Sequence, residues 1–280
     1  MPLKRLADVA ADYDALLCDL WGVVHDGKRA FEGAVEALCT FRAGGGKVVL
    51  ISNVPKLRKP IPGQLDRLGV PRAAWDAVVT SGDAIHSELA RRAPGRMHLF
   101  GPSADRGLWA GLDFQLVELD SADFVLATAL GDTEHPRDYA EDLKVAHSRG
   151  LDLVCANPDV VVRFGDRLYW CAGALVQEYE QLGGTVVLAG KPHPPIYHLA
   201  FEELARLFGR APDIRRVLAI GDGPGTDVLG ANRHGLDCLF IGGGIERDTV
   251  GSDGDLDLVR VSDVLERAGT HARYAARELR

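Results

Sequence analysis

The sequence lacks the features that would place the protein in a membrane or on a nucleic acid. No apolar run in its 280 residues approaches the length needed to cross a bilayer. Residues 1–20 are interrupted by Asp8, Asp12 and Asp14, so we expect no signal peptide there. Basic residues are in the minority, and a net charge of −8 leaves no basic face for a phosphate backbone. We therefore expect neither a membrane nor a nucleic acid as a partner.

Paired cysteines are also missing. The chain has an odd number of cysteines without a CxxC motif, at positions 18, 39, 155, 171 and 238. This scatter predicts reduced, mostly buried thiols in a cytoplasmic protein. There are no internal repeats and no low-complexity tracts. The hydrophobic content of 46% is typical of a globular protein with a real core, and the length allows one large domain or two smaller ones.

Short apolar runs alternate with amphipathic stretches at both ends of the chain. The runs predict strands over residues 15–18, 47–52, 77–80, 186–189, 217–220 and 238–241. The amphipathic stretches predict helices over residues 34–43, 64–68, 195–208 and 228–234. Such βαβ repetition predicts an α/β fold with a parallel sheet covered by helices.

The middle of the chain has a strand pattern of its own. It contains predicted strands over 97–100, 114–118, 124–127 and 153–156, a polar helix over 137–149, and turns at 131–132 and 165–166. We therefore divide the chain into a first core part over 1–88, an inserted α/β cap domain over 89–187 and a second core part over 188–280. A cap above the carboxyl ends of the core strands would exclude water and select the substrate. We expect the tail after Gly269 to be weakly tied down.

Polar residues follow the apolar runs of the core at four places. Asp19 ends the first strand, Ser52 and Asn53 end the second, Lys191 follows the run at 186–189, and the acidic loop Gly221–Asp227 follows the strand at 217–220. In an open α/β sheet, the carboxyl ends of the strands present reactive groups to a crevice. These residues are therefore the candidate site.

The residue types fit phosphoryl transfer. A carboxylate such as Asp19 can accept a phosphoryl group and form an aspartyl phosphate. The charge of that group must be neutralised, and Mg²⁺ prefers oxygen ligands of the kind that Asp19 and Asp222 offer. Asp227 would orient these ligands from behind, Ser52 would donate to a phosphoryl oxygen, and Lys191 would hold carboxylate and phosphate together as a point charge.

Each feature alone has a simpler interpretation. The acidic loop could be a tight turn before a helix, Ser52 and Asn53 could be a helix cap, and Lys191 could be a solvated loop lysine. The segment before Lys191 is no P-loop, because Thr185 stands at the first glycine position and Pro192 replaces Ser or Thr. The occurrence of all four features at successive strand ends argues against coincidence.

In these motifs the chain resembles the haloacid dehalogenase-like (HAD) hydrolases, and among them the NagD-like class IIA phosphatases. Asp19 matches the nucleophile motif, Ser52 and Asn53 the second motif, Lys191 the third, and Gly221–Asp227 the fourth. Three further segments resemble the class IIA branch: residues 157–159, 173–175 and 190–194. The resemblance implies a Rossmann-like core, Mg²⁺, and hydrolysis of a small phosphorylated metabolite through an aspartyl intermediate.

The chain departs from the family pattern at Trp21. The resemblance implies an aspartate there that protonates the leaving oxygen, and it implies that the backbone carbonyl of this residue binds Mg²⁺. Trp21 keeps the carbonyl but has no acid, and the loss of general acid–base help typically costs about 10²–10⁴-fold in rate. His25 and His193 lie near the motifs and are candidates to replace it. Two alternatives stay open: a non-catalytic phosphate-binding or regulatory protein, and a hydrolytic dehalogenase, whose relatives need no Mg²⁺.

The residues that choose the substrate are expected mainly on the cap. Asn157, Asp159 and Arg163 are candidate contacts together with Asn53 of the core, and Arg163 could meet an anionic substrate. For the cap residues, the alternative is hydrogen bonding within the cap. The sequence leaves both the identity of the substrate and assembly into a homo-oligomer open.

Overall fold

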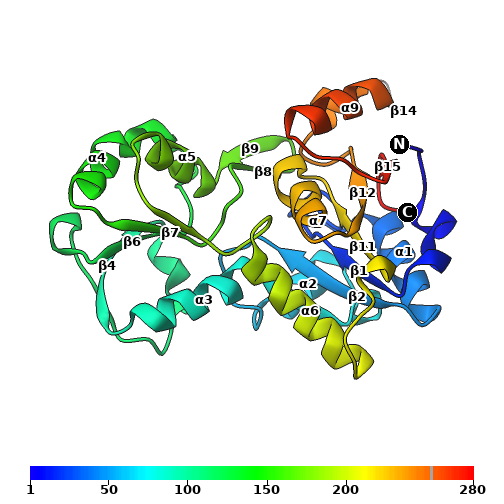
Figure 1. Cartoon of the computed structure of the whole chain (residues 1–280), viewed down its shortest axis with the longest axis horizontal. Coiled ribbons are helices and arrows are strands. Elements are labelled where there is room, and N and C mark those ends of the chain that lie inside the picture. Colours follow the sequence, from blue (N-terminus) through cyan, green and yellow to red (C-terminus); the bar gives the residue numbers. More distant parts are fainter. Residues whose placement is uncertain (253–254) are drawn as a thin grey trace.

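The structure is a computed structural model, and it describes residues 1–252 and 255–280. Two parallel sheets lie at opposite ends of its longest dimension (Figure 1). The larger sheet has the strand order β15-β12-β11-β1-β2-β3. Its strands are β1 (Ala15–Cys18), β2 (Lys47–Ser52), β3 (Ala77–Thr80), β11 (Val217–Gly221), β12 (Asp237–Ile241) and β15 (Tyr274–Ala276).

The larger sheet is covered on both faces, so its central strands read as continuous apolar runs rather than alternating ones. Leu16 and Leu50 point to the face where α1 (Glu32–Ala43) and α2 (Ile61–Leu68) pack. Leu17 and Val49 point to the opposite face and meet four other helices. These are α3 (Ser81–Arg92), α6 (Pro194–Phe208), α7 (Leu229–Arg233) and α9 (Leu258–Arg267). The predicted α/β core, a parallel sheet with helices on both faces, is confirmed.

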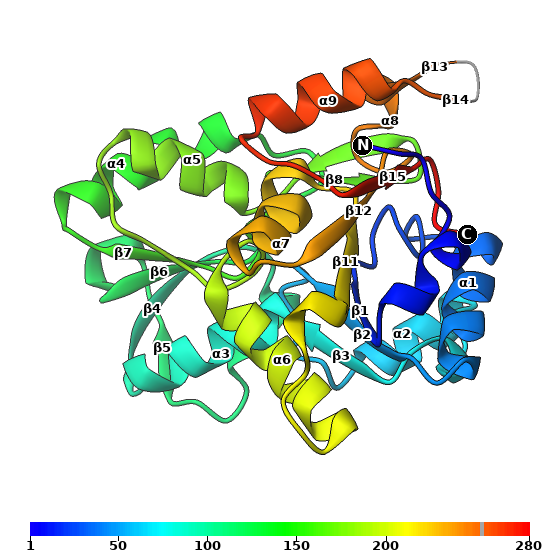
Figure 2. The ribbon, with the colours of Figure 1, turned by 45° about the vertical axis from the view of Figure 1, so that its right-hand side comes forward.

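The smaller sheet has the order β10-β7-β6-β4-β5. Its strands are β4 (Gly95–Phe100), β5 (Phe114–Leu116), β6 (Phe124–Ala127), β7 (Asp152–Cys155) and β10 (Val186–Leu188). One face packs against α4 (Ala140–Ser148) and α5 (Gly173–Gln181), and the other joins the apolar cluster of α3. A two-stranded hairpin, β8 (Val161–Phe164) and β9 (Arg167–Trp170), extends from this unit toward the core (Figure 2).

Two predictions about strands were wrong. We expected residues 186–189 to be a strand of the core, but β10 pairs with β7 of the smaller sheet through Val186 and Leu153. We also expected the tail after Gly269 to be loosely held. Instead β15 is the edge strand of the core, Leu239 pairs with Tyr274, and Leu279 is buried. The domain limits at 88/89 and 187/188 stay a prediction.

Four helices, α3, α5, α8 (Arg247–Val250) and α9, and the hairpin were not predicted. Helix α3 starts directly after β3, because Thr80 and Asp83 form a capping box in which each side chain accepts from the other's backbone N–H. The short elements near the C-terminus include helix α8 and the two-residue strands β13 (Gly251–Ser252) and β14 (Asp255–Leu256). No helix among the described residues is long and apolar enough to span a bilayer.

Candidate active site

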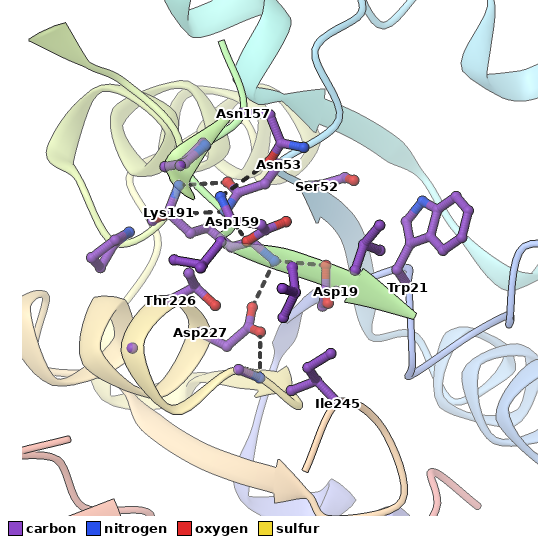
Figure 3. A pocket seen from close by; sticks show the side chains of 18 of the residues that line it. Asp19, Trp21, Ser52, Asn53, Asn157, Asp159, Lys191, Thr226, Asp227 and Ile245 are labelled. Carbon is purple, nitrogen blue, oxygen red and sulfur yellow. Dashed lines mark hydrogen bonds and ion pairs between the residues drawn. The ribbon is translucent and has the colours of Figure 1, made fainter. Parts of the chain in front are cut away.

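The candidate site forms where three neighbouring core strands end. Strands β11, β1 and β2 are adjacent and parallel, so their carboxyl ends share one edge of the sheet. Asp19 follows β1, Ser52 ends β2 and Asp222 follows β11. Figure 3 shows Asp19 and Ser52 together with Asp227, which lies in a short π-helical turn over Pro224–Val228. The predicted motifs therefore converge in space.

Lys191 lies between two of the carboxylates. Its Nζ donates to Asp19 Oδ1 at 2.6 Å and to Asp227 Oδ1 at 2.7 Å, and the residue is 2% exposed. Asn53 fixes the backbone of Lys191, since its Oδ1 accepts from Lys191 N at 2.7 Å and its Nδ2 donates to the carbonyl at 3.2 Å. Lys191 is therefore an ordered cation in a buried site.

The cluster carries more negative than positive charge. Burial, and then the charge of Asp227, raise the pKa of Asp19 to about 7. Burial, and then the charges of Asp19 and Asp227, raise the pKa of Asp222 well above its usual value. Burial favours neutral Lys191, but the neighbouring carboxylates outweigh it and hold the pKa of the lysine above its usual value. One ammonium group does not balance three carboxylates, so the site favours a further cation.

The donor set fits a divalent cation with hard oxygen ligands. One carboxylate oxygen each from Asp19, Asp222 and Asp227 lies within 4.8 Å of the others, and all three residues are buried. Asp222 Oδ2 accepts from the backbone N of Ile245 at 2.6 Å. Within the described residues Asp222 Oδ1 has no hydrogen-bond partner, which leaves it free to bind a metal. Both oxygens of Asp227 accept hydrogen bonds, from Lys191 and from Gly223 N.

The sequence analysis missed the residues that make room for Asp222. A Cβ added at Gly22 or Gly244 would lie 2.0 or 1.9 Å from Asp222 Oδ2. Gly22 also has a φ of +76°, which other residues rarely adopt. Ile245 was missed as well, although the three glycines at 242–244 directly after β12 mark a place where the backbone approaches another group closely.

A cavity of about 690 Å³ opens above this cluster, and cap residues form its far wall. Asn157, Asp159 and Arg163 all line it, as the sequence analysis expected of substrate contacts. Asp159 is also joined to the core, because Asn53 Nδ2 donates to its Oδ1 at 2.8 Å. Arg163 pairs with Asp248 at 2.7 Å, and its buried Nε has no hydrogen-bond partner among the described residues. Whether these residues bind substrate stays a prediction.

Trp21 lines the cavity beside Asp19 (Figure 3). Its ring packs edge-on against His25, with the centroids 5.0 Å apart, and against Phe164 of the cap hairpin at 6.0 Å. His25 is buried beneath this ring and does not belong to the described cavity lining, whereas His193 does. His25 Nδ1 accepts from Gly27 N at 3.1 Å, so this histidine supports the loop that carries Trp21.

His25 makes the stability of the fold depend on pH. Burial lowers its pKa from 6.5 to about 4, so unfolding below pH 6.5 is coupled to proton uptake. The stabilisation is complete above pH 6.5, is lost as pH falls toward 4, and amounts to about 3 kcal/mol. We expect His25→Asn, whose Oδ1 can still accept from Gly27 N, to lose this part of the pH dependence. Urea unfolding of both proteins at pH 7, 6, 5 and 4.5 measures it, and parallel curves would contradict the assignment.

The comparisons with known proteins agree with this geometry. A model described as haloacid dehalogenase-like hydrolase matches residues 16–115, and one described as HAD-hydrolase-like matches residues 188–266. A haloacid dehalogenase-like hydrolase from Brucella suis has a crystal structure with a TM-score of 0.88 and 41% identity, with full coverage of both chains. The chain belongs to the haloacid dehalogenase-like hydrolase family.

Two relatives carry more specific names. The chain is 30% identical to D-glycerol 3-phosphate phosphatase of Mycobacterium tuberculosis over 84% of its own length, and it spans 65% of that protein. Structures of a glycerol phosphate phosphatase from the same organism hold calcium in one case and magnesium in another. The calcium form has a TM-score of 0.65 and 27% identity over 96% of this chain and 72% of that one. The magnesium form has a TM-score of 0.61 and 26% identity over 90% of this chain and 74% of that one.

Proposed function

We propose that the protein is a Mg²⁺-dependent phosphatase that hydrolyses a small phosphorylated metabolite through an aspartyl phosphate on Asp19. The observation that carries this proposal is the position of Lys191 between Asp19 and Asp227, with Asp222 close enough to share a cation. The phosphatase names of the relatives, and the divalent cations in two of their structures, support it.

The metal would be held by Asp19, by Asp222 and by the backbone carbonyl of Trp21. Asp227 would keep the ligands in place from behind, because Lys191 and Gly223 N occupy both of its oxygens. When bound, Mg²⁺ would neutralise charge on the phosphoryl oxygens. This donor set of carboxylates and a carbonyl is the hard-oxygen set that Mg²⁺ takes.

The remaining residues bind and orient the phosphoryl group. Asp19 attacks phosphorus, while Ser52 Oγ and Lys191 Nζ donate to the phosphoryl oxygens. Ser52 is buried and lines the cavity, so its hydroxyl meets little competing water. Asn53 and the cap residues Asn157, Asp159 and Arg163 form the wall that contacts the rest of the substrate. Displacement of halide from carbon gives no reason for three buried carboxylates around one lysine.

Hydrolysis of p-nitrophenyl phosphate tests this proposal directly. Its leaving group needs little protonation, so the assay probes the nucleophile and the metal without an acid. We expect turnover that requires Mg²⁺ and stops when EDTA is added. Absence of turnover with Mg²⁺, Mn²⁺ and Ca²⁺ would contradict a catalytic role and favour a binding protein, and release of halide from a haloacid without metal would indicate a dehalogenase.

Replacement of Trp21 by Asp should create an acid beside the nucleophile. We expect Trp21→Asp to raise kcat on an alkyl phosphate such as glycerol 3-phosphate by about tenfold or more, within the range of general acid catalysis. Trp21→Phe is the matched control, because it keeps an aromatic ring against His25 and Phe164 but adds no acid. Steady-state kinetics of the three proteins measure the effect. Equal rates for the Asp and Phe variants would show that an acid at this position gives no advantage.

A further inference from the structure

Hydrolysis of an alkyl phosphate requires a proton donor for the leaving group, and the core residues described so far do not supply one. An alkoxide is a poor leaving group unless a positioned acid protonates it as its bond to phosphorus breaks. The indole of Trp21 cannot supply this proton, and Lys191 already donates to Asp19 and Asp227. Outside the three clustered aspartates, the described cavity lining contains four other side chains with carboxyl or imidazole groups: Asp159, Glu180, His193 and Glu246.

Among these four, Asp159 has direct bonds to the core site. Asn53 Nδ2 donates to Asp159 Oδ1 at 2.8 Å, and the same amide group binds the backbone of Lys191. On the cap side, Asp159 N donates to Asn157 Oδ1 at 3.1 Å, which fixes the backbone that carries the carboxyl. Figure 3 shows Asp159 next to Asn53 and Lys191, and both Asp159 and Asp19 line the cavity.

The second oxygen of this carboxyl group is available. Within the described residues Asp159 Oδ2 has no hydrogen-bond partner, while Oδ1 is held by Asn53. An oxygen held as an acceptor and a free oxygen beside it is the arrangement in which a carboxylic acid carries its proton on the free side. With a hydrogen bond from the free oxygen to a substrate, both oxygens of the Asp159 carboxyl group would have a partner.

We infer that Asp159 of the cap is the acid–base catalyst of this enzyme and takes the role that Trp21 cannot fill. This inference rests on the proposed phosphatase function. Asp159 adds the proton to the oxygen of the departing alcohol, so the catalytic group comes from the cap rather than from the loop after the nucleophile. Protonation then requires the cap to be docked on the core.

The charges around Asp159 agree with this role. Burial, the largest cause, raises its pKa above the usual value, and the charge of Asp227 acts in the same direction. The charge of Lys191 and the hydrogen bond from Asn53 act the other way. By contrast, burial lowers the pKa of His193, so this imidazole is a weaker candidate to hold a proton. Glu180 lines the cavity but is exposed.

The two steps balance. In the first step the Asp19 carboxylate forms a bond to phosphorus, the bond from phosphorus to the alkyl oxygen breaks, and that oxygen takes the proton from Asp159 Oδ2. Asp159 is then a carboxylate that still accepts from Asn53. In the second step water attacks phosphorus and gives a proton to Asp159, and the bond between phosphorus and Asp19 breaks. Inorganic phosphate leaves with both carboxyl groups restored.

The test compares a poor and a good leaving group in four proteins. Glycerol 3-phosphate and p-nitrophenyl phosphate are assayed with Mg²⁺ for the wild type, Asp159→Asn, Trp21→Asp and the double variant. We expect Asp159→Asn to lower kcat on glycerol 3-phosphate at least 30-fold more than on p-nitrophenyl phosphate. We also expect Trp21→Asp to raise kcat on glycerol 3-phosphate at least tenfold more in the Asp159→Asn background than in the wild type. The reason is that the effects of two acids in one site are not additive. Asp142→Asn, at an exposed position of α4 outside the described cavity lining, is the matched control and should change the turnover of neither substrate.

Other results would distinguish a failure of the Asp159 inference from a failure of the proposed phosphatase function. Equal losses on both substrates, or equal gains of Trp21→Asp in both backgrounds, would show that Asp159 only positions Asn53, and would overturn the inference. If Asp159→Asn does not fold, the wild type alone decides through a series of phosphate esters with increasingly basic leaving groups. A shallow dependence of kcat on leaving-group pKa supports the presence of an acid catalyst. Failure of the wild type to hydrolyse any alkyl phosphate would overturn the inference. No Mg²⁺-dependent turnover of p-nitrophenyl phosphate by the wild type would instead contradict the proposed function.

Discussion

Asp19→Asn should lower kcat for p-nitrophenyl phosphate by about 10⁴-fold or more, because an amide is not a nucleophile toward phosphorus and removal of a catalytic nucleophile typically costs this much or more. The substitution also replaces one charged ligand of the proposed metal by a neutral oxygen, which saturating Mg²⁺ compensates. An amide oxygen can still accept from Lys191 Nζ, which lies 2.6 Å from Asp19 Oδ1. The expected result is therefore loss of the chemical step with the fold retained. Steady-state turnover with saturating Mg²⁺ measures it.

The stability of this variant provides an internal control. Burial raises the pKa of Asp19 to about 7, which means that the folded protein disfavours its ionised form. Without bound metal, we therefore expect Asp19→Asn to unfold at an equal or higher urea concentration than the wild type at pH 8. Asp66→Asn, at an exposed position of α2, should leave activity unchanged. Turnover of Asp19→Asn near the wild-type rate would place the nucleophile elsewhere.

Lys191→Met should have the second-largest effect, on both catalysis and stability. It leaves Asp19, Asp222 and Asp227 together without the ammonium group that donates to two of them. Removing one partner of a buried ion pair costs about 3–5 kcal/mol, and loss of a donor to a reacting oxygen costs about 10²–10³-fold in kcat. We expect losses of this order in urea unfolding at pH 8 and in turnover. Lys59→Met, at an exposed position, is the control.

The destabilisation should depend on pH and on metal. Asp19 and Asp222 have raised pKa values, so these two carboxyls take up protons as pH falls, and the repulsion within the cluster then weakens. The cost of Lys191→Met should therefore be smaller at pH 5 than at pH 8. Mg²⁺ should raise the melting temperature of the variant, because a ligand that binds only the folded state stabilises it. A cost that is the same at both pH values would contradict repulsion among these carboxylates as its cause.

The core strands that carry the site could be predicted closely from the sequence. The predicted and observed bounds of β1, β2 and β3 are identical, and β11 extends one residue further. These strands are buried on both faces, so each is a short apolar run between turn signals. The polar residue that ends each run then marks the sheet edge. This is why Asp19, Ser52 and Asp222 could be placed together without a structure.

The partners of the outer strands could not be predicted in the same way. An apolar run such as Val186–Leu188 has the same composition whether it joins the core or the cap, and only the path of the preceding helix α5 brings it beside β7. The sequence after Gly269 predicted a weakly held tail because it mixes apolar residues with basic and acidic ones. Its three-residue strand β15 nevertheless pairs with β12, and the Tyr13 hydroxyl at the same edge donates to Asp237 at 2.6 Å.

The cap side of the site needed tertiary structure for the same reason. Asn157, Asp159 and Arg163 could be named as candidates from their motif, but the bond between Asn53 and Asp159 joins residues 106 positions apart. The pairing of Arg163 with Asp248 likewise joins the cap hairpin to helix α8. No local pattern indicates such contacts, because they depend on how the two sheets are placed relative to one another.

Trapping of the covalent intermediate tests the central claim most directly. The wild type is mixed with ³²P-labelled phosphate ester and Mg²⁺, quenched in acid within milliseconds, digested, and analysed for the labelled peptide. The account predicts label on the peptide that contains Asp19, released by hydroxylamine as expected for an acyl phosphate, and absent in Asp19→Asn. Turnover without any labelled protein, or label on another residue such as His193, would contradict it.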